Sequence, residues 1–329
     1  MEEKILNTIN KYNMIEPGDT VVCGISGGPD SICMLDILIK IRNSKKINFE
    51  IVVCHVNHLI REEATLDEEY VADFCKKNNI KYFIKRIDIK ELSNNNKQGI
   101  EETGRNARYE FFNEIFKNEN ANKIAIAHNK NDKAETIIMN ILRGTGIAGL
   151  KGIEPIRANK YIRPLIETDR NEIEKYCKMN NLNPRIDKTN FINDCNRNKV
   201  RNIVIPYIKE EFNSNIINTL ERLACVITEE DEYIKKIIRN SFNNVKIHED
   251  KNNIVLDWKK FRVIEDFMKK RIIMYSIEKV LGSMQNIEKV NIEDILKLCT
   301  NNIGNKYLMP NKNIKIYVNN GKITFTKIV

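Results

Sequence analysis

The hexapeptide Ser26-Gly27-Gly28-Pro29-Asp30-Ser31 comes directly after an apolar run at residues 20–25. A buried strand that leads into two glycines and then into a helix is typical of a phosphate-binding loop, because glycine lets the backbone approach an anion closely. The helix expected over residues 30–40 would direct its N-terminal amides at that anion. Ser26 and Ser31 would add hydroxyl donors, and Asp30 is a candidate Mg²⁺ ligand. The alternative is an ordinary glycine-rich turn.

The loop differs from two common nucleotide-binding sequences. No lysine follows the glycines, so the G-x-x-x-x-G-K-[ST] pattern is absent, and so is the G-x-G-x-x-G pattern. The S-G-G-x-D-S string instead resembles the loop of the ATP pyrophosphatase (PP-loop) superfamily. Members of that superfamily cleave ATP between the α- and β-phosphates and adenylate a substrate, so the resemblance makes ATP the expected nucleotide.

Strand-like and helix-like segments alternate through the first half of the chain. Short β-rich runs lie at residues 20–25, 49–55, 80–87 and 123–127, and segments with helical spacing of apolar residues lie between and after them, at 30–41, 65–78, 101–117 and 132–142. This order predicts an α/β fold with a parallel sheet that is covered on both faces. Ligands of such sheets bind beyond the carboxyl ends of the strands.

The second half of the chain has a different pattern. Residues 213–240 carry one apolar stripe at helical spacing, which suits a helix that joins two domains, and 259–283 and 291–301 each read as one helix. Asn319-Asn320-Gly321 separates two β-rich runs and predicts a hairpin. Residues 92–100 and 143–160 are expected to be loops. We therefore predict a PP-loop catalytic domain over 1–212, and a helical linker with a small α+β domain over 213–329.

Charge and cysteine usage narrow the function classes. The chain has a net charge of +9, of which +6 falls in residues 213–329, so a polyanion such as RNA is one expected partner; drift in amino-acid composition is the other explanation. The 8 cysteines are scattered, with no C-x-x-C, which argues against disulfide, zinc and iron–sulfur frameworks. No apolar run is long enough to span a membrane, and no signal peptide is visible, so we expect a cytoplasmic location.

Histidines and arginines stand near the expected strand ends. His55 and His58 follow the second strand, with Arg61 and Glu62 close behind, and His55 is expected near the nucleotide. Arg105 and Arg108 are three residues apart and share one helix face, which suits phosphate or carboxylate binding. Each has an ordinary alternative: His58 would be a loop histidine, and the two arginines would lie on a solvated helix face.

The fourth strand ends at His128, and Asp132 and Glu135 follow at the start of a helix. Carboxylates at that position also stabilise the helix dipole, which is the plain explanation. The functional explanation makes His128 and Asp132 a general base, an ATP contact or a metal ligand.

Two later stretches have two interpretations each: they would either bind phosphate or form ordinary solvated helix surface. They are the glycine-rich residues 143–152, and the polar and basic residues 187–201, which include Arg197, Lys199 and Arg201.

Together these motifs resemble one family, the tRNA-isoleucine lysidine synthetases, over about residues 20–210. The matching strings, in order, are Ser26–Ser31, His55–Arg61, Gly104–Tyr109, Ala127–Thr136, Arg143–Gly152, Arg163-Pro164-Leu165 and Asp187–Arg201. Enzymes of that family use ATP to adenylate the C2 oxygen of the wobble cytidine in an isoleucine tRNA with a CAU anticodon. The side-chain amine of free L-lysine then displaces AMP, so that the tRNA reads AUA instead of AUG.

The resemblance implies site residues, cofactors and partners. ATP would be held by Ser26, Gly27, Gly28, Pro29, Asp30 and Ser31, with His55 and Arg108, and Mg²⁺ by Asp30 and Asp132. Catalysis would fall to Asp30, His128, Asp132 and Arg105, and tRNA contacts to Arg197, Lys199 and Arg201. The family also leads us to expect a homodimer and a tRNA-binding role for the small domain within residues 213–329.

The chain departs from the family pattern in two places. Asn131 stands where many members have a second aspartate, which shifts the expected metal ligation to Asp132. The chain also resembles members that keep the first appended domain and lack the second. The alternatives are a tRNA thiolase of the same superfamily, for which the sequence has no paired cysteines, and an ATP-dependent amidotransferase acting on a small molecule. A third class, a non-catalytic RNA-binding protein, would not need Asp30, His128 and Asp132.

Overall fold

The computed structural model describes residues 1–59, 64–185, 192–301 and 306–328. It divides into two compact units, Met1–Ile227 and Thr228–Val329. The sequence placed the second domain from residue 213, whereas the division lies inside the long helix α11 (Ile216–Val245). Arg61, Glu62 and residues 187–190, which the sequence analysis singled out, lie outside the described residues.

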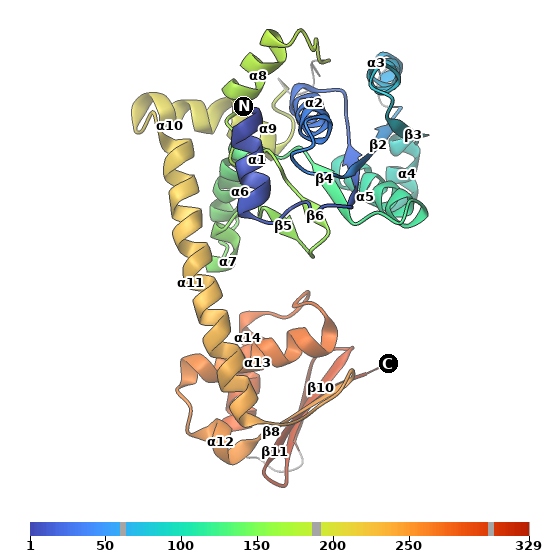
Figure 1. The fold of residues 1–329 in the computed structure, drawn as a ribbon. Helices are drawn as coiled ribbons and strands as arrows, with labels where there is room; N and C mark the ends of the chain where they lie inside the picture. Colours follow the sequence, from blue (N-terminus) through green and yellow to red (C-terminus); the bar gives the residue numbers. More distant parts are fainter. Residues whose placement is uncertain (60–63, 186–191, 302–305, 329) are drawn as a thin grey trace. The chain divides into compact units, whose positions relative to one another are not determined.

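The first unit is built on a six-stranded sheet with the order β3-β2-β1-β4-β6-β5. Figure 1 labels all of these strands except β1. The strands are β1 (Thr20–Gly24), β2 (Glu50–Asn57), β3 (Lys81–Arg86), β4 (Lys123–Ile126), β5 (Ile156–Arg157) and β6 (Tyr161–Ile162). All neighbours pair in parallel except β5 and β6, which are antiparallel. The predicted α/β fold with a parallel sheet is therefore confirmed.

Helices cover both faces of this sheet, as its buried strands require. The helical elements of the first unit before α11 are α1 (Glu2–Lys11), α2 (Pro29–Asn43), α3 (Ala64–Lys77), α4 (Ile89–Asn96), α5 (Ile100–Asn118), α6 (Lys130–Leu142), α7 (Ile147–Leu150), α8 (Arg170–Met179), α9 (Asn196–Lys199), the π-helical turn η2 (Val200–Val204) and α10 (Ile205–Glu211). One apolar core includes α2 and the β1 residues Val21 and Cys23, and another includes Val22 of β1 with Phe111 and Phe112 of α5. Successive β1 side chains thus face opposite layers.

Two expected loops contain regular structure. Residues 92–96 belong to α4, whose first turn is capped by the Asp88 side chain accepting a hydrogen bond from the Glu91 amide. The segment 143–160 contains α7 and β5, so it is only partly a loop. Both predictions were wrong because polar and glycine-rich composition does not report capping or edge-strand pairing.

The second unit has a five-stranded antiparallel sheet with the order β7-β8-β11-β10-β9. Its elements after α11 are β7 (Lys246–Glu249), β8 (Asn253–Asp257), α12 (Trp258–Arg262), α13 (Asp266–Leu281), α14 (Lys289–Asn301), β9 (Tyr307–Asn311), β10 (Ile314–Asn319) and β11 (Lys322–Lys327). The predicted hairpin joins β10 and β11, and Asn320 and Gly321 both have positive φ, as a primed turn requires. The single helix expected over 259–283 is wrong, because the chain breaks between α12 and α13.

No helix among the described residues combines the length and the apolarity that crossing a membrane would require.

Candidate nucleotide-binding and catalytic site

The glycine-rich loop is held in shape by its own hydroxyl groups. Ser31 Oγ accepts a hydrogen bond from the Ser26 amide at 3.2 Å and donates one to the Gly28 carbonyl at 3.0 Å. Gly27 has a φ of +88°, a conformation that side chains rarely adopt, so this turn depends on glycine. Gly28 caps α2, and Pro29 occupies its first turn, where a missing N–H costs nothing. The loop therefore ends on free helix amides, which suit an anion.

Asp30, in the first turn of α2, is paired with a buried asparagine. Asn129 Nδ2 donates to Asp30 Oδ1 at 2.9 Å, and Asn129 is fully buried. The orientation of the amide is fixed, because the Asn129 Oδ1 accepts from the Asp132 amide at 3.0 Å. Burial, followed by the nearby Asp132 carboxylate, raises the pKa of Asp30 to about 6. Arg170, the Asn129 amide and Arg201 oppose this rise without cancelling it.

Asp132 closes the start of α6 and joins a cluster of buried charges. Its Oδ2 accepts from the Asn129 amide at 3.0 Å, and its Oδ1 lies 3.1 Å from Arg197 and 3.0 Å from Arg201. Burial alone would raise the pKa of this carboxyl, but Arg197 and the other positive and donor groups around it hold the pKa below its usual value. Asp132 is therefore a fixed anion.

Glu135 lies one helical turn further along α6 and is 1 % exposed. Arg197 Nε donates to it at 3.0 Å, and Arg201 Nε at 2.6 Å. The charge cluster of Asp132, Glu135, Arg197 and Arg201 thus connects α6 to α9 and η2. Sequence reasoning treated Glu135 only as a helix-start carboxylate, because burial of a charged side chain leaves no local sequence signal.

The predicted RNA-contacting residues have different environments. Arg197 and Arg201 are engaged with the two carboxylates of the charge cluster, whereas Lys199 is exposed. Asn131 also has a partner, since its Oδ1 accepts from the Arg170 amide at 3.0 Å at the start of α8.

His128 lies just beyond β4 and accepts a hydrogen bond. Arg163 Nε donates to His128 Nδ1 at 3.2 Å. Because arginine can only donate, the neutral His128 ring carries its proton on Nε2. Burial, opposed by Asp132 and helped by Arg163 and Arg197, lowers the pKa of His128 to about 3. The ring is therefore a neutral donor near pH 7.

A cavity of about 370 Å³ opens beside His128. Its lining includes four arginines and a lysine but one carboxylate, that of Glu154; the described lining residues are Arg105, His128, Thr136, Ala148, Lys151, Gly152, Ile153, Glu154, Arg157, Arg163 and Arg197. Arg163 is 4 % exposed and has no carboxylate partner among the described residues. A desolvated guanidinium facing a cavity suits an anionic ligand.

Aromatic rings hold two of these arginines. The Arg157 guanidinium lies 4.5 Å from the ring centre of Tyr161 and 5.0 Å from that of Tyr109, and Arg105 lies 5.5 Å from Tyr109. These contacts orient positive charge without neutralising it. Arg108, predicted to share a face with Arg105, is exposed and is not among the lining residues.

His55 is placed beside the loop, inside β2 rather than after it. The ring is buried, and its Nδ1 donates to the Ile25 carbonyl at 2.8 Å, immediately before the loop. Its Nε2 has no hydrogen-bond partner among the described residues. Burial lowers the pKa of His55, so Nε2 is a buried acceptor. His58 has a similar environment: its Nδ1 is unpartnered within the described part of the chain, and burial, helped by Arg108, lowers its pKa to about 4.

Comparisons with known proteins agree on this unit. The PP-loop domain family matches residues 1–208. A tRNA(Ile)-lysidine synthase of Clostridioides difficile (strain 630) is 43 % identical over 325 residues, covering 98 % of this chain and 70 % of the relative. A tRNA(Ile)-lysidine synthase of Clostridium acetobutylicum is 43 % identical over 324 residues, covering 98 % and 69 %.

One solved structure shares the fold. The U34-tRNA thiolase NcsA from Methanococcus maripaludis with its [4Fe-4S] cluster has a TM-score of 0.55 at 22 % identity, covering 68 % of this chain and 77 % of that one. At this identity the likeness concerns the fold alone.

Proposed function

The chain belongs to the PP-loop domain family and, within it, to the tRNA(Ile)-lysidine synthases, and on that premise we propose that it ligates free L-lysine to an isoleucine tRNA with a CAU anticodon. The cytidine C2 oxygen attacks the α-phosphorus of ATP, and the bond to pyrophosphate breaks. The lysine side-chain amine then attacks C2, the C2–O bond breaks, and AMP leaves while the amine loses a proton. The observation that carries the proposal is that the glycine-rich loop, Asp30 and the arginine-lined cavity meet at one sheet edge.

ATP fits the loop by charge and geometry. The Gly28-capped start of α2 offers amides to the phosphates, and the buried Nε2 of His55 is an acceptor beside the loop that an amino group of a nucleotide base would satisfy. We assign the phosphates to the stretch from Ser26 to Ser31. The Ser31 hydroxyl mainly fixes the loop, since it already joins Ser26 to Gly28.

Mg²⁺ fits Asp30 better than Asp132. Asp30 Oδ2 accepts no hydrogen bond within the described part of the chain, whereas both oxygens of Asp132 already have donors. Mg²⁺ typically takes one or two carboxylates together with phosphates and waters, so the lack of a group of three His, Cys, Asp or Glu side chains among the described residues does not conflict. Bound there, the ion would neutralise charge on the departing pyrophosphate.

The contacts favour a donor role for His128 and an anchoring role for Asp132. His128 Nδ1 is occupied by Arg163, so the ring presents an N–H to the cavity and would stabilise the charge that develops on a phosphate. Asp132 is held by two arginines and has a lowered pKa, which makes it a poor base. Both assignments differ from the general-base role considered from the sequence.

The charged groups that line the cavity suit a bound amino acid next to an RNA phosphate. Only roughly one lysine side chain in 2,500 is neutral at pH 7, so the site must bind an ammonium and release its proton. Glu154, the one carboxylate among the described lining residues, is the group we assign to that ammonium. Arg105, Arg157 and Arg163 would then take the substrate carboxylate and a neighbouring phosphate.

The direct test follows AMP formation by the purified full chain. With Mg²⁺, ATP, labelled lysine and an unmodified isoleucine tRNA transcript with a CAU anticodon, we expect AMP and the label to appear together in equal amounts. A transcript with uridine at the wobble position is the control and should yield neither. AMP formed without any tRNA would instead support the amidotransferase alternative, and no AMP with any substrate would contradict the proposal.

A further inference from the structure

The sheet of the second unit has one covered and one uncovered face. Alternate β10 residues Ile314, Ile316 and Val318 are fully buried in a core with α13 and α14. The residues between them, Lys315 and Tyr317, belong to none of the apolar clusters of the described chain. Since side chains alternate along a strand, these two point to the opposite side, which we call the outer face.

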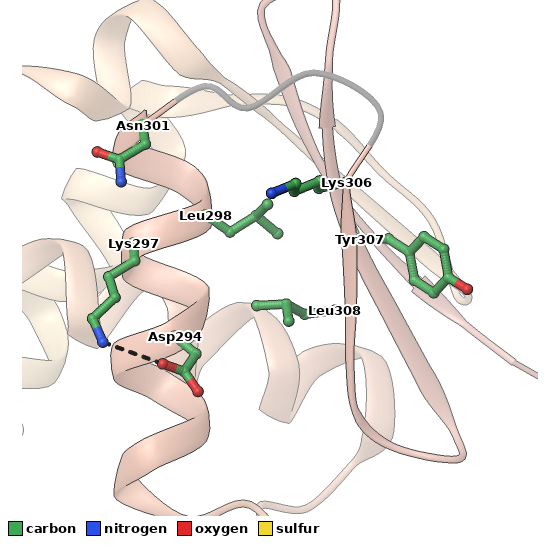
Figure 2. A pocket seen from close by; sticks show the side chains of 7 residues that line it. All are labelled: Asp294, Lys297, Leu298, Asn301, Lys306, Tyr307 and Leu308. Atoms are coloured by element: carbon green, nitrogen blue, oxygen red, sulfur yellow. Dashed lines mark hydrogen bonds and ion pairs between the residues drawn. The ribbon is translucent and has the colours of Figure 1, made fainter.

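One row of aligned residues crosses all five strands on the outer face. Strand pairing places Tyr307 opposite Tyr317, Tyr317 opposite Thr324, Thr324 opposite Val255, and Val255 opposite His248. In Figure 2, Tyr307 points away from α14, whereas its neighbour Leu308 points toward α14 and into a cavity of about 460 Å³. Two tyrosines therefore lie side by side on the outer face.

Tyr307 is accessible, Tyr317 is half-buried, and both lie beside positive charge. Tyr307 is 56 % exposed. The Lys315 ammonium lies 4.3 Å from the ring centre of Tyr307 and 5.9 Å from that of Tyr317. Lys322, by alternation, is on the same face, opposite Asp257, whose side chain caps α12. Residues 228–329 hold 19 Lys and Arg against 13 Asp and Glu, a net charge of +6.

We propose that the outer face binds unpaired nucleotides of the RNA substrate, with bases stacked on Tyr307 and Tyr317 and phosphates held by Lys315. Aromatic rings on an open sheet accept any base, because every base has a π-face, and a lysine between them matches the backbone charge. Lysine is depleted at the centre of protein–protein interfaces, whereas here Lys315 lies against both tyrosine rings. The proposal rests on the proposed function for the nature of the RNA.

The experiment measures binding of short RNA to the full chain, without ATP or lysine. The probes are a fluorescein-labelled single-stranded octauridylate and a blunt RNA duplex of the same length. Tyr307→Ala and Tyr317→Ala should each raise the dissociation constant for the single strand by at least about 5-fold, the loss expected for one stacked base. The phenylalanine replacements should bind like the parent. Tyr233→Ala, at a tyrosine of α11 that is 66 % exposed, is the matched control.

A second readout reports stacking itself. The fluorescence of 2-aminopurine within the single strand should be quenched by the parent chain and recover with the alanine variants. Unchanged affinity in both alanine variants, or an equal loss with Tyr233→Ala, would overturn the proposal. An equal loss for the duplex would also overturn it, because phosphate contacts alone would then explain binding.

The outcomes separate the two proposals. RNA binding that depends on Tyr307 and Tyr317, in a chain that forms no AMP, would remove the proposed function and leave the outer face in place. AMP formation on tRNA by the parent chain, with binding unaffected by either tyrosine variant, would do the reverse.

Discussion

The two units place their polar side chains in opposite ways. The first unit buries ionised groups within its structure: Glu135 is 1 % exposed, Arg163 is 4 % exposed and Asp132 is 7 % exposed. The second unit has an apolar core, and its one buried cation, among the described residues, is Lys269, which pairs with the exposed Asp266. Its aromatic and basic groups face outward.

If both proposals hold, this difference separates chemistry in the first unit from recognition in the second. A desolvated charge interacts strongly with a reacting group but destabilises the fold when it loses its partner. Exposed rings and lysines contribute little to the fold, so they are free to serve binding. Substitutions in the first unit should therefore change stability and turnover together, whereas substitutions on the outer face should change affinity alone.

The largest effect is expected at Asp30. We expect Asp30→Asn to lower kcat/KM for AMP formation by about 1,000-fold or more, because the ligand assigned to Mg²⁺ is lost. The ligand-free variant should nevertheless be more stable than the parent at pH 7, by up to about 3 kcal/mol, since the folded-state pKa of about 6 exceeds the unfolded value. Urea unfolding of both proteins from pH 4 to 8 measures this.

The variant is expected to be the more stable protein because the pKa of Asp30 is raised in the folded state. The parent keeps the full contribution of protonated Asp30 below about pH 4 and loses it as the pH rises through about 6. Asp30→Asn has no carboxyl group to ionise at this position. The difference in the free energy of unfolding between the variant and the parent should therefore grow as the pH rises from about 4 through about 6. Asp73→Asn, at an exposed ion pair of α3, is the control and should show no such growth.

The buried and exposed ion pairs give a direct contrast. Glu135→Gln should cost about 3–5 kcal/mol of the free energy of unfolding, because Arg197 and Arg201 lose a buried partner. Glu249→Gln, at a partly exposed carboxylate of the second unit paired with Lys246 and Lys279, should cost about 1 kcal/mol or less. Chemical denaturation measures the free energy of unfolding of both variants. Equal losses in the two variants would show that the units do not differ in how strongly they depend on their ion pairs.

A smaller effect is expected at Arg163. Arg163→Leu removes the donor to His128 Nδ1 and one cause of its lowered pKa, so that pKa should rise from about 3 toward its usual value. We expect kcat/KM to fall about 10- to 100-fold, with the acid-side decline in rate moved to higher pH as the ring gains its second proton more readily. Arg163→Lys should retain part of the activity. Nitrogen NMR of the ring follows its titration, and an unchanged pKa of His128 would contradict this role.

The smallest effect concerns the binding of ATP with Mg²⁺. An ion held by Asp30, as proposed, would compete with a proton there, so the affinity should weaken about tenfold for each pH unit below about 6. Isothermal titration between pH 5 and 7 in two buffers measures the slope and the proton release. In Asp30→Asn the slope should vanish, and persistence of the slope would place the ion elsewhere.

The sequence was sufficient where a pattern depends on local chemistry. Alternation and helical spacing predicted the parallel sheet, and Asn320-Gly321 predicted the hairpin because its turn requires positive φ at both residues. The glycine-rich loop and His128 were also predicted to follow neighbouring strands, and they lie just after β1 and β4, which pair in parallel. These features are set by residues close together in the chain.

The features of the fold and of the candidate site that the sequence did not predict depend mostly on contacts between distant segments. The pairing of Asn129 with Asp30 spans 99 residues, and that of Arg201 with Glu135 spans 66. The break between α12 and α13 also has no single signal, although the Asp257 side chain fixes where α12 starts. No local pattern states that an asparagine or a glutamate will be buried, so such partners emerged only from the structure.

Asn129 has a kinetic consequence. By joining Asp30 of α2 to the first turn of α6, it ties two helix starts into one rigid frame before any substrate arrives. The glycine-rich loop and the start of α2 are thus ordered before a ligand binds, so little of the binding free energy is needed to order them. We expect ATP to enter with an association rate that is limited by encounter rather than by rearrangement.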